Sequence, residues 1–391
     1  MRLKRRINDL LVAAINLERH VDPLFRRGLD RVLRAPIAAM VQWLINRRRR
    51  DDVRLGIAEE RALPDEAEIT RAIIDSMSAF TRRTYPHGGA ERAGNTKTYG
   101  VVRGSFEVLP GLPDDLRQGV FAEPRTFPVW IRFAGPGPIA PPDIKDNGIL
   151  SIGIKLMGVA GEKLLDERHT QDFTGISAPT FTTPDIRGNV KLQHHILAGT
   201  PIFYFLGPRD SHLLDAVMQG LYSRTQSSPL ETRYWSCVAY LLGEGRAMHY
   251  SIRPSSDRRT PVPLRPSDDY LREAMARTLA ESDVEFDFMI QLQTDPHRMP
   301  IENASVEWPE RLSPFVTAAK LRIPAQRFDS EHQLAFAGNL SYNPWHCIAE
   351  HRPLGNQNRA RRSIYRELSR LRQEINRQPH IEPTGDERFE A

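Results

Sequence analysis

Short apolar runs alternate with dense turn signals between residues 101 and 157, and this pattern constrains the fold more than any other feature of the sequence. The runs are V-V-R-G-S-F-E-V-L (101–109), F-P-V-W-I-R-F-A (127–134) and L-S-I-G-I-K-L-M (150–157), with turn clusters such as G-P-G-P-I-A-P-P-D between them. Short runs rich in β-branched and aromatic residues are typical of strands. The pattern therefore predicts antiparallel strands joined by turns.

Further strands are predicted at 233–242, 246–253 and 286–294, and the sequence G-E-G-R after Leu242 predicts a hairpin. Helices are predicted from about Pro64 to Arg83, at 211–223, at 267–280 and from about Asn358 to Asn376. The fold class is therefore α+β, with helices inserted between antiparallel strands and appended at the end. This number of strands makes a β-barrel plausible.

The first 60 residues differ in composition from the rest of the chain. The apolar runs L-L-V-A-A-I-N-L and A-P-I-A-A-M-V-Q-W-L-I have helical spacing and lie among R-L-K-R-R, F-R-R and R-R-R-R. We predict a basic amphipathic helical arm over 1–60, a main domain over 61–380 and a flexible tail over 381–391. The arm could lie on an anionic membrane surface or clasp a partner subunit, or it could pack on its own domain.

The net charge of +5 comes mainly from arginine, which favours small anionic groups or an anionic surface as partners. The excess is too small to argue for nucleic acid, so no nucleic-acid partner is predicted. The sequence has no run of roughly 18 apolar residues and no signal-peptide pattern. We therefore expect a cytoplasmic protein, with peripheral attachment to a membrane as an open alternative.

Several common catalytic motifs are absent. Cys237 and Cys347 are the only cysteines, which excludes a structural zinc site built on paired cysteines. The sequence contains no Gly-rich phosphate loop, no H-E-x-x-H and no G-x-S-x-G. His346 and His351 lie in a loop-like stretch, where no spacing supports a metal site.

One tyrosine in the last predicted helix is surrounded by arginines. In R-R-S-I-Y-R-E-L-S-R-L-R (361–372), Arg361 lies four residues before Tyr365 and Arg372 lies seven after it. At about 100° per residue, the three side chains point within roughly 40° of one another. A phenol between two guanidiniums is an environment for a tyrosinate, whereas the plainer alternative is a solvated basic helix.

Several segments together resemble the heme catalases and their catalase-like relatives. The spacing of Arg361, Tyr365 and Arg372 is similar to the family's proximal motif, in which the tyrosinate is the axial iron ligand. Four further segments resemble family segments in the same order: R-A-G-N-T-K-T-Y-G-V-V-R-G-S-F-E-V (92–108), V-W-I-R-F-A (129–134), D-F-T-G-I-S-A-P-T-F (172–181) and Y-W-S-C-V-A-Y-L-L-G-E-G-R-A-M-H-Y (234–250). The resemblance covers about residues 85–375 and implies a catalase-like antiparallel β-barrel that binds heme b.

The resemblance also implies roles for single residues. Tyr365 would ligate the iron, and Arg361 would keep its phenol deprotonated. Arg92, Arg132 and Arg372 would be candidates for the heme propionates, since guanidiniums suit buried carboxylates. A homo-oligomer is expected by analogy, because the family tends to self-associate.

The distal side departs from the family's pattern. The position of the family's distal histidine holds Asn95, or Thr96 after a shift of one residue, and the distal asparagine position falls on Ile176, next to Ser177. Neither Asn95 nor Thr96 is a general base near neutral pH, and such proton transfer typically contributes ~10²–10⁴-fold to a rate. We predict that Asn95, Thr96 and Ser177 contact the peroxide without shuttling its proton.

The polar stretch T-Q-D-F-T-G-I-S-A-P-T-F-T-T-P-D (170–185) has no clear helical or strand period. It is predicted either as a loop that lines the site or as a long surface connection.

Taken together, the sequence predicts a catalase-like heme protein that acts on hydroperoxides, whether organic, lipid or hydrogen peroxide. Two alternatives remain open. One is a fatty-acid hydroperoxide lyase or isomerase at a membrane surface, and the other is a non-catalytic heme-binding relative.

Overall fold

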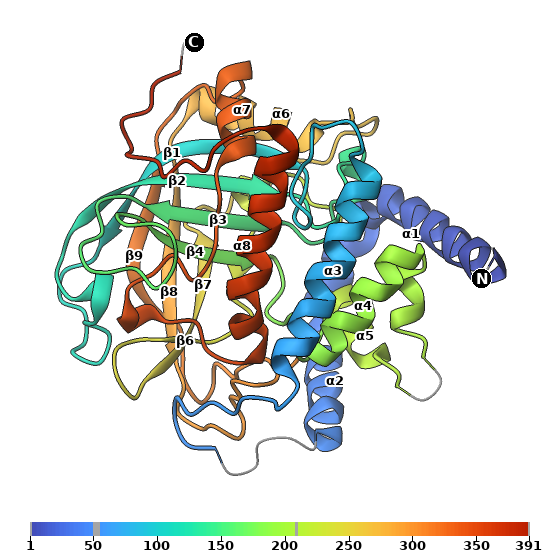
Figure 1. Ribbon diagram of the computed structural model, residues 1–391, viewed down its shortest axis with the longest axis horizontal. Helices are drawn as coiled ribbons and strands as arrows, with labels where there is room; N and C mark the ends of the chain where they lie inside the picture. The colour runs from blue at the N-terminus through green and yellow to red at the C-terminus, as the bar shows by residue number, and fades with distance from the viewer. Residues whose placement is uncertain (1, 50–54, 208–209, 390–391) are drawn as a thin grey trace.

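The computed structural model describes residues 2–49, 55–207 and 210–389. Its centre is one antiparallel sheet with the strand order β5-β4-β3-β2-β1-β9-β8-β7-β6, in which β5 also pairs with β7 (Figure 1). This additional pairing closes β1 to β5 and β7 to β9 into a barrel of eight strands. The remaining short strand, β6, pairs with β7. The predicted α+β fold with an antiparallel barrel is confirmed.

The strands are β1 (Thr98–Val108), β2 (Thr126–Ala134), β3 (Ser151–Leu156), β4 (Gln171–Ile176), β5 (Tyr234–Trp235), β6 (Tyr240–Leu241), β7 (Ala247–Pro254), β8 (Val284–Leu292) and β9 (Val316–Ile323). The predictions for β1, β2, β3, β7 and β8 are confirmed, and so is the hairpin, in which Leu241 pairs with Ala247. The sequence analysis missed β4 and β9. The strand predicted over 233–242 is instead two short strands, because Cys237 has a φ of 59°, a conformation that a strand cannot hold.

The barrel interior is filled by aromatic side chains. Phe106 lies with its ring centroid 6.1 Å from Phe121, 6.1 Å from Phe173 and 5.1 Å from Phe288. All four rings are buried. A ligand site in this molecule therefore has to lie outside the barrel wall.

The helices are α1 (Arg2–Leu29), α2 (Ala35–Arg48), α3 (Glu66–Thr84), α4 (Ile186–Ala198), α5 (Leu213–Tyr222), α6 (Tyr270–Glu281), α7 (Glu331–Asn339) and α8 (Asn356–Asn376). Predictions for α3, α5, α6 and α8 are confirmed, whereas α4 and α7 were missed. The helices α3, α4 and α8 lie together on one side of the barrel (Figure 1). They pack through a small apolar cluster that includes Ile73, Ile186 and Ile364.

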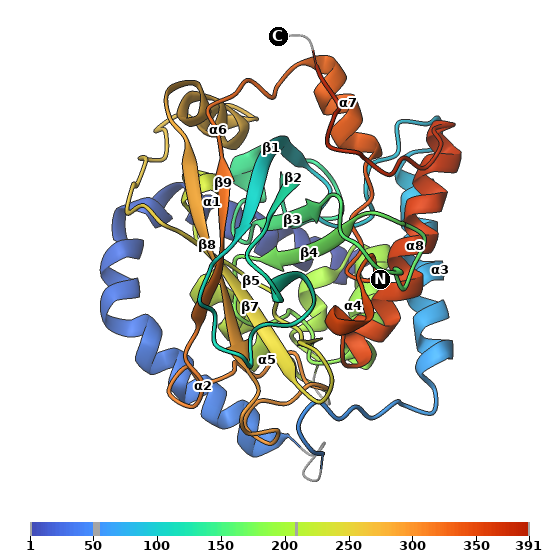
Figure 2. The ribbon, with the colours of Figure 1, turned by 90° about the vertical axis from the view of Figure 1, so that its left-hand side faces the viewer.

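Helices α1 and α2, joined by a π-helical stretch at Asp30–Arg34, form an arc along one side of the molecule (Figure 2). The predicted arm is thus helical from Arg2 to Arg48, while Met1 and residues 50–54 lie outside the described residues. Helix α2 packs on α5 through Val41 and Met218.

The predicted flexible tail, residues 381–391, returns to the barrel over its described part. The Glu382 carboxylate accepts hydrogen bonds from the backbone N–H groups of Arg168 and His169, and Glu387 accepts one from Trp130 Nε1 at 2.9 Å. Residues 390 and 391 lie outside the described residues.

His351 packs against the aromatic core as a neutral ring. Its Nε2 accepts a hydrogen bond from the Val120 N–H at 3.0 Å, and its centroid lies 5.4 Å from that of Phe121. Gly119 is needed beside it, because a Cβ there would lie 2.3 Å from the same nitrogen. Burial lowers the pKa of His351 to about 4.

This burial predicts an acid-sensitive contribution to stability. Because the folded-state pKa of about 4 lies below the ordinary 6.5, the contribution is fully present above pH 6.5 and is lost as the pH falls through 4. Its size is about 3 kcal/mol. His351→Gln keeps an acceptor but does not titrate, so the free energy of unfolding in urea should fall less between pH 7 and pH 4 than in the parent. The exposed His20→Gln is the control, and an unchanged pH dependence in His351→Gln would contradict the account.

Candidate functional site

A cavity of about 760 Å³ lies outside the barrel, among the outer wall of strands β2 to β4 and helices α3, α4 and α8. This volume falls within the roughly 300–1,000 Å³ typical of cofactor and ligand pockets. Ile15 and Arg19 of α1 also line it. The cavity therefore separates the helices from the outer wall of the barrel.

Strand register places polar side chains on the cavity side of the barrel. Arg132 of β2 pairs with Gly153 of β3, which in turn pairs with Thr174 of β4. Phe173 points into the barrel core, so Thr174 next to it points outward. Gly153 leaves room for Tyr342, since a Cβ there would lie 2.8 Å from the tyrosine ring.

Helix α8 brings Arg361 and Tyr365 to the other side of the cavity. The Arg361 guanidinium carbon lies 4.8 Å from the centroid of the Tyr365 ring. Its Nη1 donates to Asn358 Oδ1 and its Nη2 to Thr174 Oγ1, both at 2.9 Å. The buried Nε of Arg361 has no hydrogen-bond partner among the described residues.

The electrostatics of Arg361 keep it charged. Burial by itself would lower the pKa of the guanidinium, but attraction to Tyr365 and Tyr240 outweighs burial and raises it. Arg361 is only 8% exposed. A permanent positive charge therefore lies against a cavity-lining phenol, screened from water.

The predicted propionate residues converge on the same cavity. Arg92, Arg132 and Arg372 all line it, and each donates to backbone carbonyls, such as Arg132 to Asn95 and Arg372 to Asn339. Burial lowers the pKa of Arg92 to about 10. Burial and the neighbouring guanidiniums lower the pKa of Arg132 and of Arg372 well below the ordinary value.

No carboxylate forms an ion pair with any of these three arginines in the described part of the chain. Arg132 and Arg372 are buried and Arg92 is half-buried, and such like charges repel one another unless an anion lies between them. The arrangement is therefore suited to binding an anionic group.

The predicted distal residues divide into two groups. Asn95 lines the cavity, in a left-handed conformation with a φ of 49°. Thr96 and Ser177 are not among the lining residues, because backbone groups occupy their hydroxyls. Thr96 Oγ1 donates to the Arg92 carbonyl at 2.7 Å, and Ser177 Oγ accepts from the Leu150 N–H at 2.8 Å.

The stretch 170–185 lines the site, but its first part is not a loop. Residues Gln171–Ile176 form β4 in the barrel wall, and only the part after it is irregular. Thr174 and Ile176 line the cavity from this strand. A two-residue alternation through Asp172, Thr174 and Ile176 was the signal that could have identified them.

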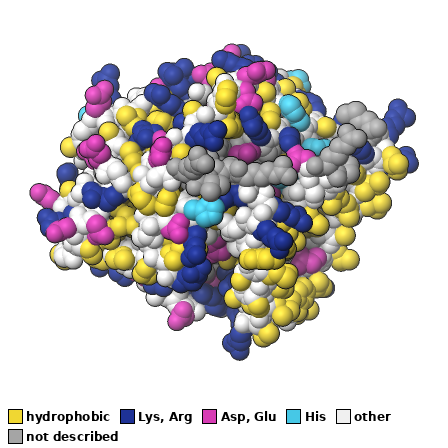
Figure 3. All heavy atoms as spheres, turned by 90° about the horizontal axis from the view of Figure 1, so that it is seen from below, with side chains coloured by type: hydrophobic (Ala, Val, Ile, Leu, Met, Phe, Trp, Pro, Cys, Tyr) yellow, Lys and Arg dark blue, Asp and Glu magenta, His cyan; other side chains and the backbone are white. Residues whose placement is uncertain are grey.

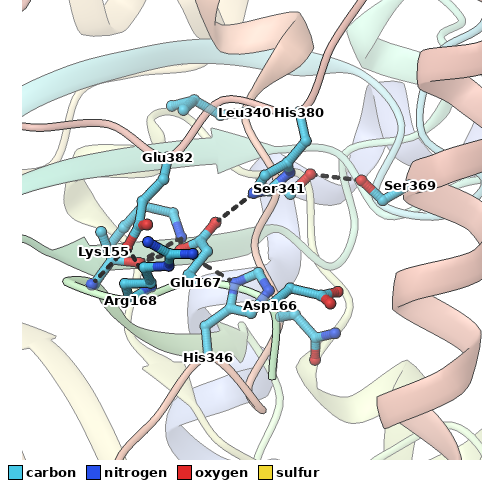
Figure 4. Close-up of polar contacts among 12 residues, drawn as sticks. Lys155, Asp166, Glu167, Arg168, Leu340, Ser341, His346, Ser369, His380 and Glu382 are labelled. Carbon is cyan, nitrogen blue, oxygen red and sulfur yellow. Dashed lines mark hydrogen bonds and ion pairs between the residues drawn. The ribbon is translucent and has the colours of Figure 1, made fainter. Parts of the chain in front are cut away.

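A buried charged cluster beside the cavity was missed by the sequence analysis (Figure 4). Lys155 Nζ contacts Glu167 and lies 2.8 Å from Asp172 Oδ1, and His346 Nδ1 lies 2.9 Å from Asp172 Oδ2. Lys155 and Asp172 are register neighbours on β3 and β4. Although burial alone would lower the pKa of Lys155, attraction to Asp172 and Glu167 raises it. The ammonium thus balances both carboxylates, while His346 lines the cavity.

Removing this ammonium should be far more costly than removing an exposed one. Lys155→Met leaves two buried carboxylates without a cation and should lower the free energy of unfolding by ~3–5 kcal/mol. Lys320→Met is the matched control, because Lys320 Nζ also lies 2.7 Å from two carboxylates, those of Glu285 and Asp287, but is partly exposed. The control should cost about 0–1 kcal/mol. Equal losses of stability in urea would contradict the role assigned to burial.

Comparison with solved structures decides the architecture. The chain is similar to a fungal catalase, catalase A from Saccharomyces cerevisiae and a bacterial catalase, with TM-scores of 0.58, 0.61 and 0.56. The matches cover 82%, 88% and 85% of this chain and 66%, 72% and 67% of those chains.

The fold is catalase-like. Sequence identities of 16%, 14% and 13% mean that the likeness extends to the fold alone. No protein-family model matches the sequence, and a comparison with curated proteins finds no match. The chain spans about two thirds of the length of the fungal catalase.

Proposed function

We propose that this protein binds heme b in the cavity beside its catalase-like barrel and acts on hydroperoxides, with Tyr365 as the iron ligand. One observation carries the proposal. The same cavity presents a phenol against a buried Arg361 and, separately, three buried or half-buried arginines without a carboxylate partner in the described chain. A heme bound here would have an anionic partner for each of these features: the Tyr365 phenolate would lie against Arg361, and its carboxylates would pair with the three arginines.

Arg361 would hold the axial ligand in its reactive form. A guanidinium beside a phenol stabilises the phenolate, which is the form that binds ferric iron. The hydrogen bond from Arg361 to Thr174 fixes the guanidinium between α8 and the barrel wall. Tyr365 would then be presented to the cavity by a helix that cannot rotate without breaking this contact.

Arg92, Arg132 and Arg372 would hold the propionates. Each already donates to backbone carbonyls, which orients the guanidinium and leaves its remaining donors for a carboxylate. Binding two carboxylates would relieve the mutual repulsion of the three cations. The bound heme would supply the redox chemistry that cleaves a peroxide O–O bond.

Asn95 limits what the other side of the cavity can do. Its amide can donate a hydrogen bond to a peroxide oxygen, but it cannot take up a proton and return it. This favours organic or lipid hydroperoxides over rapid disproportionation of hydrogen peroxide. A heme-binding relative without turnover is the second candidate, favoured by the same residue. Incubating the heme-loaded protein with hydrogen peroxide and, separately, with cumene hydroperoxide distinguishes the two, since a relative without turnover would consume neither.

Tyr365→Phe should abolish stable heme binding. The substitution removes the ligand oxygen and leaves the packing of α8 intact, so the folded protein should lose its heme absorption after gel filtration. Tyr204→Phe is the matched control, because that hydroxyl is buried outside the cavity without a hydrogen-bond partner among the described residues. A Tyr365→Phe protein with full heme content and an unchanged spectrum would show that another residue ligates the iron.

Arg132→Gln should weaken heme binding without abolishing it. Loss of one buried guanidinium partner of a carboxylate typically costs 2–5 kcal/mol, or roughly 30-fold to 4,000-fold in affinity. Heme transfer to apomyoglobin measures the loss. Arg253→Gln, which removes a half-exposed arginine outside the cavity, is the control and should retain the parent's heme affinity. Equal affinities in both variants would contradict propionate binding by Arg132.

A further inference from the structure

Helix α1 buries its polar face and exposes its apolar face. Its buried residues are Asn8, Asp22 and Arg26. Asn8 Oδ1 accepts a hydrogen bond from the Ile202 N–H at 3.1 Å, and Arg26 Nη2 donates to the Gly220 carbonyl at 2.9 Å. An ordinary surface helix does the reverse and packs its apolar stripe on the core. The polar attachment therefore leaves an apolar face free for another partner.

The exposed face is a continuous stripe along the whole helix. It consists of Leu3, Leu10, Leu17 and Leu24, with Ile7 and Val21 beside them. The four leucines are 70%, 71%, 70% and 82% exposed. At about 100° per residue, positions seven apart stay on one face, and this face lies opposite Asn8 and Arg26. Figure 3 shows hydrophobic side chains gathered at the margin toward which α1 extends.

The arm that carries this stripe is strongly positive. Residues 2–48 contain 11 Lys and Arg against 4 Asp and Glu, a net charge of +7 that exceeds the +5 of the whole chain. Arg6 and Arg27 are exposed along one border of the stripe. Trp43 on α2 is 57% exposed and is a residue type that prefers membrane interfaces.

Charge decides between the two surfaces that could cover such a stripe. A second copy would bring one arm of +7 against another, and the repulsion would oppose pairing. An anionic bilayer attracts each Lys or Arg near its surface and buries the leucines in the headgroup region. No described helix is long and apolar enough to cross a bilayer, so α1 would lie along the surface.

We propose that the outward face of α1 docks this protein on the surface of an anionic lipid bilayer. The same helix contributes Ile15 and Arg19 to the lining of the cavity. Docking would therefore hold the cavity next to the membrane, where the peroxidised acyl chains of lipids are found. A lipid hydroperoxide is then the substrate class, an assignment that rests on the proposed function, whereas the docking itself does not.

Vesicle flotation of the full-length protein tests the docking. The protein should float with vesicles of phosphatidylcholine and phosphatidylglycerol, bind vesicles of phosphatidylcholine alone more weakly, and dissociate as salt is raised. The triple variant Leu10→Gln, Leu17→Gln, Leu24→Gln should bind at least roughly tenfold more weakly. Leu264→Gln removes a leucine that is 98% exposed elsewhere and should bind like the parent.

Failure to float with either kind of vesicle would overturn the proposal. So would a lipid-free oligomer in sedimentation velocity that the triple variant dissociates and that does not float, since a second copy would then cover α1. The assay needs neither heme nor turnover. A protein that floats but takes up no heme would thus overturn the proposed function and leave the docking standing.

Discussion

The hydrogen bond between Arg361 on α8 and Thr174 on β4 is the contact on which the rest of the site depends. It joins the last helix of the chain to the outer wall of the barrel across a sequence separation of 187 residues. The contact holds a cation inside the protein next to Tyr365, where burial makes its field strong. Helices α3 and α4 pack on α8 and thereby enclose the remaining side of the cavity.

The distribution of charge explains why the cavity is suited to an anionic ligand. Packed aromatic rings fill the barrel interior, whereas its outer wall carries Arg132 toward the helices, where Arg92 and Arg372 also line the cavity. The three arginines of the cavity therefore lack anionic partners, whereas in the neighbouring cluster the charge of Lys155 is balanced by Glu167 and Asp172. The unfavourable free energy of such repulsion has to be offset by favourable packing and hydrogen bonds in the rest of the fold.

The sequence predicted the parts of the site that depend on local periodicity. Arg361, Tyr365 and Arg372 line one cavity because helical spacing is the same in every helix, whereas Arg132, which lines it too, was predicted from the resemblance to the catalases. Strand β4 was missed because its core face carries Gln171 and Gly175 beside Phe173. With only one large apolar residue on that face, the alternation with Asp172, Thr174 and Ile176 is weak in the sequence.

Other features depend on contacts that no sequence pattern records. His346 approaches Asp172 across a sequence separation of 174 residues, and the pairing of Lys155 with Asp172 requires the register of β3 on β4. Thr96 and Ser177 were predicted to contact the peroxide, but their hydroxyls bond to backbone groups whose positions are set by the loop conformation. The sequence also could not show that α1 is attached through its polar face, because the residues it bonds to lie far along the chain, at 198–225.

Diffraction from crystals of the heme-loaded protein, recorded at the iron absorption edge, would test the central claim most directly. The account predicts a single anomalous peak in the cavity, within bonding distance of Tyr365 Oη, with the propionates directed to Arg92, Arg132 and Arg372. A peak beside another side chain, such as His346, or heme bound outside the cavity, would contradict it.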